Sequence, residues 1–321
     1  MAVTIAGSNQ ALDASLPTIY REFRLLRDET GVMRSCATTM KLAAHEGNTK
    51  YINNYGRVIG YNVSDGADIS NSQALSDTAT GYSPSEVAVQ VILGGRTMRR
   101  VADPDLLGRT GRICANAYDL KEDTDGCTQL ASFTATTLGS AGTVLSPGHV
   151  SGAGARVMIG NSRSNPEPPQ GDIFGVFHPL SAHVLAGRLV PWSNVPTGTN
   201  VFGVNTGAHA GVTATNGGIS SGMTEDIVRR GYKALGTVGG VIVKTDANLA
   251  VDASDDCTGA VFAKEGLIYV SEEEPRLDSD TSDKSMRGAV EVNFWGSYVW
   301  GNYRAANYGN PMTFDASLPT S

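Results

Sequence analysis

The residues Gly218–Gly222 (GISSG) form the pattern in this sequence that most resembles a catalytic motif, the GxSxG turn of α/β-hydrolases. That fold requires a histidine after the serine, but the last histidine of the chain is His209. Ser221 and Thr224 are better explained as capping residues ahead of an acidic first helical turn. A triad in another chain order is the less favoured alternative, with His178, His183 or His209 as its base.

Cofactor and metal motifs are equally incomplete. Gly152 and Gly154 resemble the start of a dinucleotide loop, but Val157 replaces the third glycine and no strand precedes them. His178 and His183 lack the HExxH spacing of zinc proteases, so we interpret them as packing or capping groups. We expect no catalytic, cofactor or metal site and no enzymatic activity.

Three further clusters have simpler structural interpretations. The acidic residues within 271–285 predict a solvated loop rather than a metal site. Four cysteines without CxxC spacing predict buried, reduced thiols: Cys36, Cys114, Cys127 and Cys257. A group of aromatic residues has only Arg304 as a nearby cation, which favours core or interface packing over base stacking: Phe294, Trp295, Tyr298, Trp300, Tyr303 and Tyr308.

Composition restricts the class of protein. The 321 residues suggest about two domains. A formal net charge of −7 disfavours a dedicated nucleic-acid binder, and the 38 glycines indicate many turns. We expect a soluble protein made in a cytoplasm, because no segment has the length of a membrane helix and the N-terminus lacks a signal-peptide pattern.

The N-terminal third predicts an arm, a helix and a hairpin. Residues 1–15 read as a flexible arm, and Leu16–Arg27 predicts a helix whose apolar face needs a surface to lie on: Ile19, Phe23 and Leu26. Tyr55–Val63 and Glu86–Leu93 predict the two strands of a long hairpin, separated by a polar loop. A lone two-stranded ribbon is marginally stable, so its apolar face needs a partner.

A long helix is predicted from Asp103 to about Glu122, ending before Gly126. Its apolar positions predict one buried stripe with further residues beside it: Leu106, Ile113, Ala117 and Leu120, then Leu107, Cys114 and Tyr118. We interpret this helix as a structural spine.

The remaining chain alternates helices and strands, which predicts an α/β domain followed by strands. The expected helices are Pro147–Met158, Pro179–Leu189 and Thr224–Leu235. The expected strands are Asp172–Phe177, Val238–Val243, Gly259–Phe262, Leu267–Val270 and Gly288–Val299.

The order of these segments resembles the HK97-like fold of tailed-bacteriophage major capsid proteins. IYREFRLLRDETGVM resembles the arm, VSDGADISNSQALSDTATGYSPSEVAVQVI the extended loop, and RRVADPDLLGRTGRICANAYDLKEDTDGC the spine helix. GDIFGVFHPLSAHVLAG and the segments after it resemble the axial domain and closing strands. The resemblance covers nearly the whole chain and lies in the order and spacing of segments rather than in one motif.

The resemblance implies an α+β fold in five parts. These are an N-terminal arm and helix (1–44), an extended β-hairpin loop or E-loop (45–100), a peripheral domain with the spine helix (101–170), an axial α/β domain (171–283), and closing strands with a C-terminal tail (284–321). It also implies hexamers and pentamers that form an icosahedral shell around double-stranded DNA, in a virion assembled in the bacterial cytoplasm. The expected intersubunit contacts are Val58, Ile59, Val63, Val87, Val89, Val91, Arg96, Arg99 and Arg100, and the expected spine-helix packing residues are Leu106, Leu107, Ile113 and Tyr118.

This sequence departs from the pattern of the resembled family in two features, and both bear on the partners that we expect. Residues 51–120 contain no lysine, so an isopeptide crosslink through the loop is not expected. Only a short segment precedes the first predicted helix, so we expect scaffolding from a separate protein, beside portal and decoration proteins and no membrane. The basic cluster with Arg109 and Arg112 predicts intersubunit salt bridges, or less favoured non-specific DNA contacts. The alternatives are an encapsulin-like compartment and, less favoured, a hydrolase or carbohydrate-binding module.

Overall fold

The computed structural model describes residues 31–43, 45–56, 58, 60–65, 73–75, 77–93, 106–163, 166–189, 234–280 and 290–318. The predicted helix Leu16–Arg27, the GISSG motif and most of the predicted helix Thr224–Leu235 lie outside these residues. Within the described part, no helix combines the length and apolar character that crossing a membrane would require.

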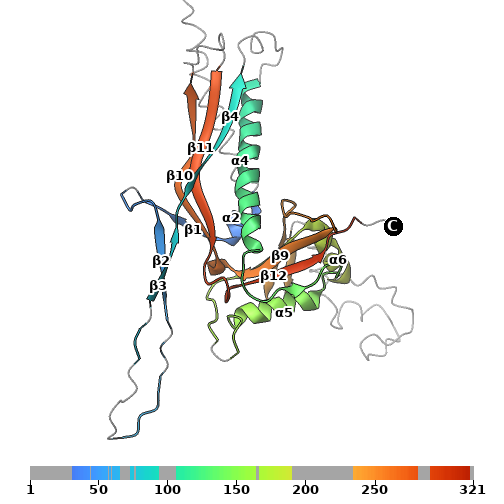
Figure 1. Ribbon diagram of the computed structural model, residues 1–321. Coiled ribbons are helices and arrows are strands. Elements are labelled where there is room, and N and C mark those ends of the chain that lie inside the picture. Colours follow the sequence, from blue (N-terminus) through green and yellow to red (C-terminus); the bar gives the residue numbers. More distant parts are fainter. Residues whose placement is uncertain are drawn as a thin grey trace, which may run out of the picture.

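A four-stranded sheet forms the long axis of the molecule (Figure 1). Its order is β1 (Thr38–Lys41), β10 (Leu267–Asp280), β11 (Val290–Asn302) and β4 (Ser85–Leu93). The parallel β1 lies on one edge, and the other neighbours pair antiparallel. Because side chains alternate along a strand, one face of β11 carries a row of buried apolar residues: Val292, Phe294, Tyr298 and Trp300.

The helix α4 (Leu106–Leu130) packs along this sheet and is 25 residues long, or about 37 Å. The prediction that it ends before Gly126 is wrong. Gly126 is buried inside the helix, where an added Cβ would come within 3.0 Å of Met33 Cβ and 3.1 Å of Trp300 Cζ2. The glycine therefore allows close packing rather than ending the helix.

The predicted buried stripe of α4 is also wrong. Ile113 and Leu120 are exposed, whereas Cys114, Ala115 and Tyr118 are buried. The helix turns Cys114, Ala115 and Tyr118 toward the sheet and directs Ile113 and Leu120 outward. Tyr118 packs as predicted, whereas the side chains of Leu106 and Leu107 lie outside the described residues.

The second sheet has six strands and lies beyond the lower end of α4 (Figure 1). Its order is β5 (Leu138–Gly139), β12 (Gly309–Asp315), β9 (Asp256–Ala263), β6 (Ile173–Phe177), β8 (Val241–Thr245) and β7 (Ala234–Val238). The helices α5 (Pro147–Met158) and α6 (Pro179–Leu189) have the predicted bounds. The Ser146 hydroxyl caps α5 by accepting a hydrogen bond from the His149 backbone N–H.

Several strand predictions need correction. The segment Val238–Val243 is not one strand, because Gly239 and Gly240 adopt positive φ and turn β7 into β8. Leu235 lies in β7 and not in a helix. The acidic segment from Ser271 to Asp280 continues β10 instead of forming a loop. Pairing with the long apolar β11 outweighs the weak strand preference of acidic residues.

The hairpin prediction is partly wrong. The antiparallel hairpin is β2 (Lys50–Tyr55) with β3 (Asp77–Tyr82), and the described residues after Tyr55 up to residue 65 are not in strands. Glu86–Leu93 is a strand, but as part of β4 it pairs with β11. The short helix α2 (Val32–Cys36) and the 3-10 helix η3 (Lys264–Gly266) complete the described elements.

Candidate assembly surface

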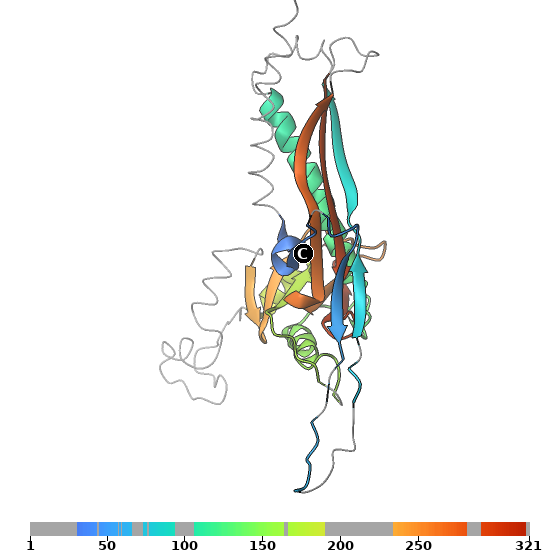
Figure 2. The same ribbon diagram turned by 90° about the vertical axis from the view of Figure 1, so that its left-hand side faces the viewer.

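The hairpin β2–β3 leads the chain away from the body of the molecule (Figure 2). Its residues pair from Lys50 with Tyr82 to Tyr55 with Asp77, and Tyr82 alone in β3 is buried. Several large apolar side chains on the hairpin and the chain beyond it are about half exposed or more: Tyr51, Tyr55, Val58, Tyr61, Val63 and Leu75. We call these six the loop side chains. Such a concentration of exposed apolar groups is typical of an interaction surface.

Tyr82 anchors the inner end of the hairpin. Its ring covers the backbone of Gly301, where an added Cβ would come within 2.3 Å of Tyr82 Cε1. The Tyr82 hydroxyl donates a hydrogen bond of 3.0 Å to the carbonyl oxygen of Asn302. Burial raises the pKa of Tyr82 to about 12, so the hydroxyl stays protonated and remains a donor at neutral pH.

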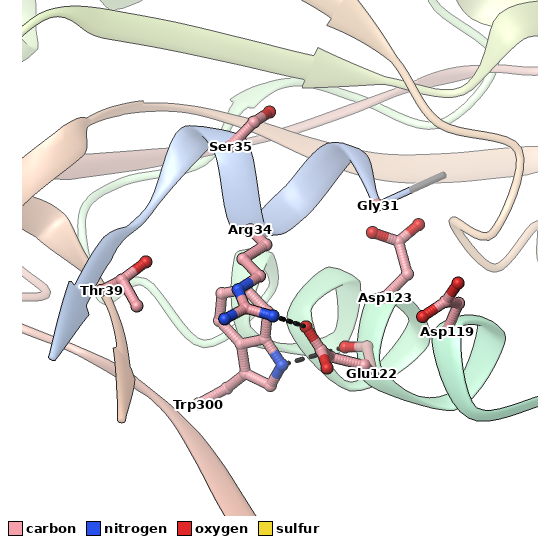
Figure 3. A pocket seen from close by; sticks show the side chains of 8 residues that line it. All are labelled: Gly31, Arg34, Ser35, Thr39, Asp119, Glu122, Asp123 and Trp300. Atoms are coloured by element: carbon pink, nitrogen blue, oxygen red, sulfur yellow. Dashed lines mark hydrogen bonds and ion pairs between the residues drawn. The ribbon is translucent and has the colours of Figure 1, made fainter. Parts of the chain in front are cut away.

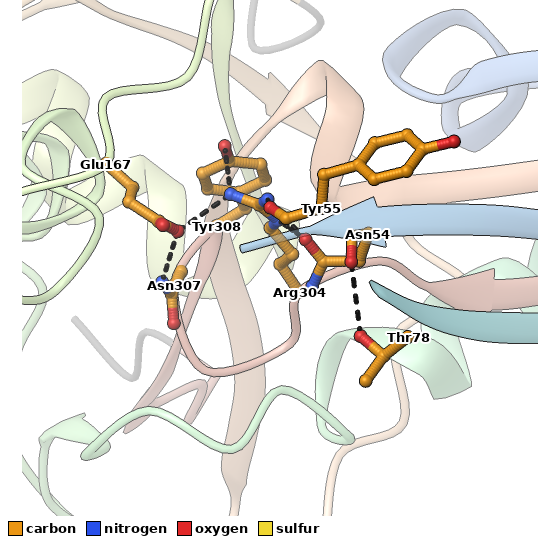
Figure 4. A network of polar contacts seen from close by, with 7 residues as sticks. All are labelled: Asn54, Tyr55, Thr78, Glu167, Arg304, Asn307 and Tyr308. Atoms are coloured by element: carbon orange, nitrogen blue, oxygen red, sulfur yellow. Dashed lines mark hydrogen bonds and ion pairs between the residues drawn. The ribbon is translucent and has the colours of Figure 1, made fainter. Parts of the chain in front are cut away.

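Arg304 fixes the hairpin at a second point, shown in Figure 4. Its Nε donates to Asn54 Oδ1 at 2.8 Å, and its Nη2 donates to the carbonyl oxygen of Tyr55 at 3.2 Å. On the other side, Nη1 donates to Glu167 Oε2 at 2.7 Å, and Asn307 Nδ2 donates to the same oxygen at 3.2 Å. We call these five residues the Arg304 network. It joins β2 to the turn after β11 and to the loop before β6.

The Arg304–Glu167 ion pair at the centre of the network is largely shielded from water, with side-chain exposures of 16% for Arg304 and 20% for Glu167. Arg304 adopts a φ of 48°, a left-handed conformation that is uncommon for arginine. A cavity of about 380 Å³ lies beside the network and is lined on the hairpin side by Asn54, Tyr55 and Thr78. The network can therefore set the direction in which the loop side chains leave the body.

A second polar region lies between α2 and α4 (Figure 3). A cavity of about 330 Å³ is lined by three α4 carboxylates that are each less than 10% exposed: Asp119, Glu122 and Asp123. Arg34 lies 3.8 Å from Glu122 Oε1 and donates to Glu274 Oε1 at 3.2 Å. Trp300 Nε1 donates to the backbone oxygen of Glu122 at 2.9 Å. The region ties the start of the described chain to both α4 and the long sheet.

Asp123, Asp246 and Cys127 form a buried cluster, in which a carboxylate oxygen of each aspartate and the Cys127 Sγ lie within 4.8 Å of one another. We call the two aspartates the carboxyl pair. Asp123 accepts from the Met33 backbone N–H at 3.0 Å and from Asn248 Nδ2 at 2.8 Å. Asp246 accepts from the Asn248 backbone N–H at 2.9 Å and from Cys127 Sγ at 3.5 Å. These donors account for each carboxylate oxygen without a metal ion. Burial first, and then the neighbouring Asp123, raises the pKa of Asp246 to about 7.

The predicted contact residues separate into three groups. Val58 and Val63 are exposed beyond the hairpin, as a contact with another molecule requires. Val87, Val89 and Val91 share one face of β4 as predicted, but they pack against the core of their own chain. Their contact with a neighbouring copy stays a prediction. Ile59, Arg96, Arg99 and Arg100 lie outside the described residues, and Arg109 and Arg112 are exposed on α4.

Several of the patterns considered for chemistry lie within the described residues and have structural roles there. Gly152 and Gly154 lie within α5 rather than in a loop. His178 Nδ1 accepts a hydrogen bond from the Leu180 backbone N–H at 3.3 Å, a capping role, and burial lowers the pKa of His178. The four cysteines are buried and unpaired, as predicted. Four of the grouped aromatic residues are buried, which confirms core packing for them: Phe294, Tyr298, Trp300 and Tyr308.

Sequence reasoning missed the Arg304 network and the carboxyl pair. Arg304 was noted only as an isolated cation among aromatic residues, and its partner Asn54 is 250 positions away. Asp123 and Asp246 likewise come together only in the folded chain. No local pattern indicates such pairs.

No protein-family model and no curated protein sequence matches the chain. Several solved structures do match. The capsid of Ralstonia phage GP4 has a TM-score of 0.61 at 14% identity, covering 89% of this chain and 88% of that chain. The head structure of Helicobacter pylori bacteriophage KHP40 has a TM-score of 0.61 at 10% identity over 90% and 92%. A chain of Mycobacterium phage Che8 has a TM-score of 0.58 at 16% identity over 89% and 92%. The predicted HK97-like, α+β capsid fold is therefore confirmed.

Proposed function

We propose that this chain is the major capsid protein of a tailed bacteriophage, which assembles into hexamers and pentamers and encloses double-stranded DNA in an icosahedral shell. The fold, shared over about 90% of the chain with phage capsid structures, supports this proposal. The role is structural rather than catalytic, and the protein acts in the virion after assembly in the host cytoplasm.

The observation that carries the proposal is the hairpin with its exposed loop side chains. A monomer gains nothing by exposing three tyrosines, two valines and a leucine to water, since each would be stabilised by burial. The Arg304 network holds the base of the hairpin firmly, so these side chains are presented to another molecule. A second copy of the chain is the partner that an assembling shell supplies.

Shell contacts can be modest individually because each is repeated many times. A gain of about 1.4 kcal/mol changes the equilibrium constant of one contact tenfold. Residues 51–120 contain no lysine, so we propose that these contacts are noncovalent. The other proposed partners are scaffolding, portal and decoration proteins. The formal net charge of −7 suits non-specific enclosure of DNA better than tight binding of DNA.

Electron microscopy and light scattering of the purified protein test the proposal. The wild-type chain should form closed particles above a threshold concentration. The triple variant Val58→Ser, Tyr61→Ser and Val63→Ser should raise that threshold at least tenfold, because it removes apolar contact area between copies. The variant should keep its thermal stability as an isolated chain.

Val251→Ser is the matched control, because Val251 is also exposed but lies far along the chain from the hairpin, next to β9. The control should assemble like the wild type. A wild-type chain that stays monomeric at every concentration, also with added scaffold, would contradict the proposal. Equal thresholds for the triple variant and the control would remove the loop side chains from the interface.

A further inference from the structure

One line of exposed apolar side chains on α4 lies apart from the hairpin. Ile113 is 64% exposed, Leu120 is 54% exposed, and Ala117 between them is also exposed. Residues spaced by three or four positions share one face of a helix, so these three form a continuous line, which we call the α4 stripe. It covers about 10 Å of the helix axis. Aligned large apolar groups at a surface indicate a contact.

The sequence before residue 31 carries a face with the same spacing. Ile19, Phe23 and Leu26 follow one another by four and then three positions, as Ile113, Ala117 and Leu120 do. A helix as short as Leu16–Arg27 is marginal in water without a tertiary partner. Its apolar face and the α4 stripe therefore each lack the surface that the other provides.

The point where the described chain begins places this segment close to the stripe. Gly31 lines the cavity beside Asp119 and Asp123, and the Met33 backbone N–H is bound to Asp123. A chain spans at most about 3.5 Å per residue, so Arg27 lies within about 14 Å of Gly31. Leu120 is adjacent to Asp119 in the helix, and the rest of the stripe extends away from Gly31 toward the start of α4.

Side-chain size fixes the register. With Leu26 against Leu120, the equal spacing places Phe23 against Ala117 and Ile19 against Ile113. A large ring then meets a small side chain, which suits the packing of ridges into grooves. In this register Arg27 comes level with residues 119–125 of α4, which carry Asp119, Glu122, Asp123 and Asp125 against Lys121 alone. Arg21 and Arg24, with Glu22 between them, lie outside that acidic range.

We propose that Leu16–Arg27 docks as a helix on the α4 stripe of its own chain, parallel to α4. The contact would fix the N-terminal segment before any contact with another copy. It does not depend on the proposed shell function, because it is made within one chain.

A disulfide experiment tests this register in the unassembled protein. The variant Phe23→Cys with Ala117→Cys should form an intramolecular disulfide under mild oxidation, identified by mass spectrometry of the linked peptides. The control pairs Phe23→Cys with Thr128→Cys, which is exposed but about 16 Å further along the helix. The four native cysteines are buried, which limits competing reactions. Absence of the link, or a link that forms only between two chains, would overturn the proposal.

Limited trypsin digestion provides a second measurement. Leu120→Glu should make cleavage after Arg21, Arg24 or Arg27 at least tenfold faster, because it places a carboxylate against Leu26. Thr128→Glu introduces the same charge on an exposed α4 position outside the stripe and should leave the rate unchanged. Equal rates for the two variants would contradict docking on the stripe even if both fold normally.

Discussion

Gly296 of β11 lies directly against the hydroxyl of Tyr118 on α4, where an added Cβ would come within 2.6 Å of Tyr118 Oη. Tyr118 also packs edge-on against Tyr298, with ring centroids 6.0 Å apart. This contact determines how closely the helix approaches the sheet, because the glycine leaves the space that the phenol fills. Closely packed interiors tolerate added volume poorly.

Gly296→Ala should lower the free energy of unfolding by about 1–3 kcal/mol, because the methyl group forces Tyr118 or the strand to move. Urea denaturation of the unassembled chain measures the change. Gly152→Ala is the control: Gly152 lies within α5 with open space around its Cβ position, so alanine should stabilise the protein by about 0.5–1 kcal/mol. Destabilisation of equal size in both variants would contradict the packing argument.

Arg304→Asn should loosen the hairpin while retaining a residue that tolerates the left-handed φ of 48°. It removes the hydrogen bonds to Asn54 and Glu167, of which the charged ones are each worth about 1.5–3 kcal/mol. Amide hydrogen exchange in β2 and β3 should accelerate about tenfold or more. Lys50→Gln breaks only the exposed pair with Glu46 and should change exchange little. Unchanged exchange in Arg304→Asn would show that Tyr82 alone holds the hairpin.

Asp246 should make stability depend on pH. Its pKa is about 7 in the folded chain, above the ordinary 3.8, so the folded state keeps a proton that the unfolded state loses. The contribution is fully present below about pH 4 and is lost as pH rises to about 7. Asp246→Asn should flatten this part of the profile in urea denaturation from pH 4 to 8.

His178 contributes with the opposite sign, because burial lowers its pKa and its contribution to stability increases with pH. The comparison of Asp246→Asn with the wild type separates the two groups, since both proteins retain His178. An identical slope in the two proteins between pH 4 and 7 would show that the carboxyl pair does not retain the proton.

Assembled particles should give a single monomer band after boiling in detergent and reducing agent. No lysine lies between residues 51 and 120, so the loop has no amine that could attack a carboxamide. Particles assembled in the native host are the strictest sample, because every maturation factor is then present. A ladder of covalent rings would contradict this prediction and would require a lysine outside this range.

Local signals predicted the elements that depend on neighbouring residues. The prolines at 147 and 179 marked the starts of α5 and α6, because proline is favoured in the first turn of a helix. The partner of β4 could not be predicted in this way. Val91 pairs with Val292, and nothing near either residue indicates the other. The prediction of which face of α4 is buried was wrong for the same reason. The sheet that covers Cys114 and Ala115 is built from segments far away in the sequence.

The candidate surface was predicted only in part. Val58 and Val63 were expected as contacts and are exposed, but the strand predicted to carry them does not form in the described residues after Tyr55. The Arg304 network does not, since its members come from three separate regions of the chain. The packing of β4 against α4 was not predicted, because a strand with one apolar face looks the same whether a helix or another copy covers it. The contact of β4 with another copy stays a prediction.

The position of β11 has a consequence for synthesis on the ribosome. This strand is central to the long sheet and pairs with both β4 and β10, yet it starts only at Val290. The nascent chain must therefore extend beyond β11 before β4 gains its neighbour, and non-local pairing of this kind is slow. Until then, α4 has no finished sheet to cover, and the subunit stays incomplete. Assembly of particles would thus begin only after β11 has left the ribosome.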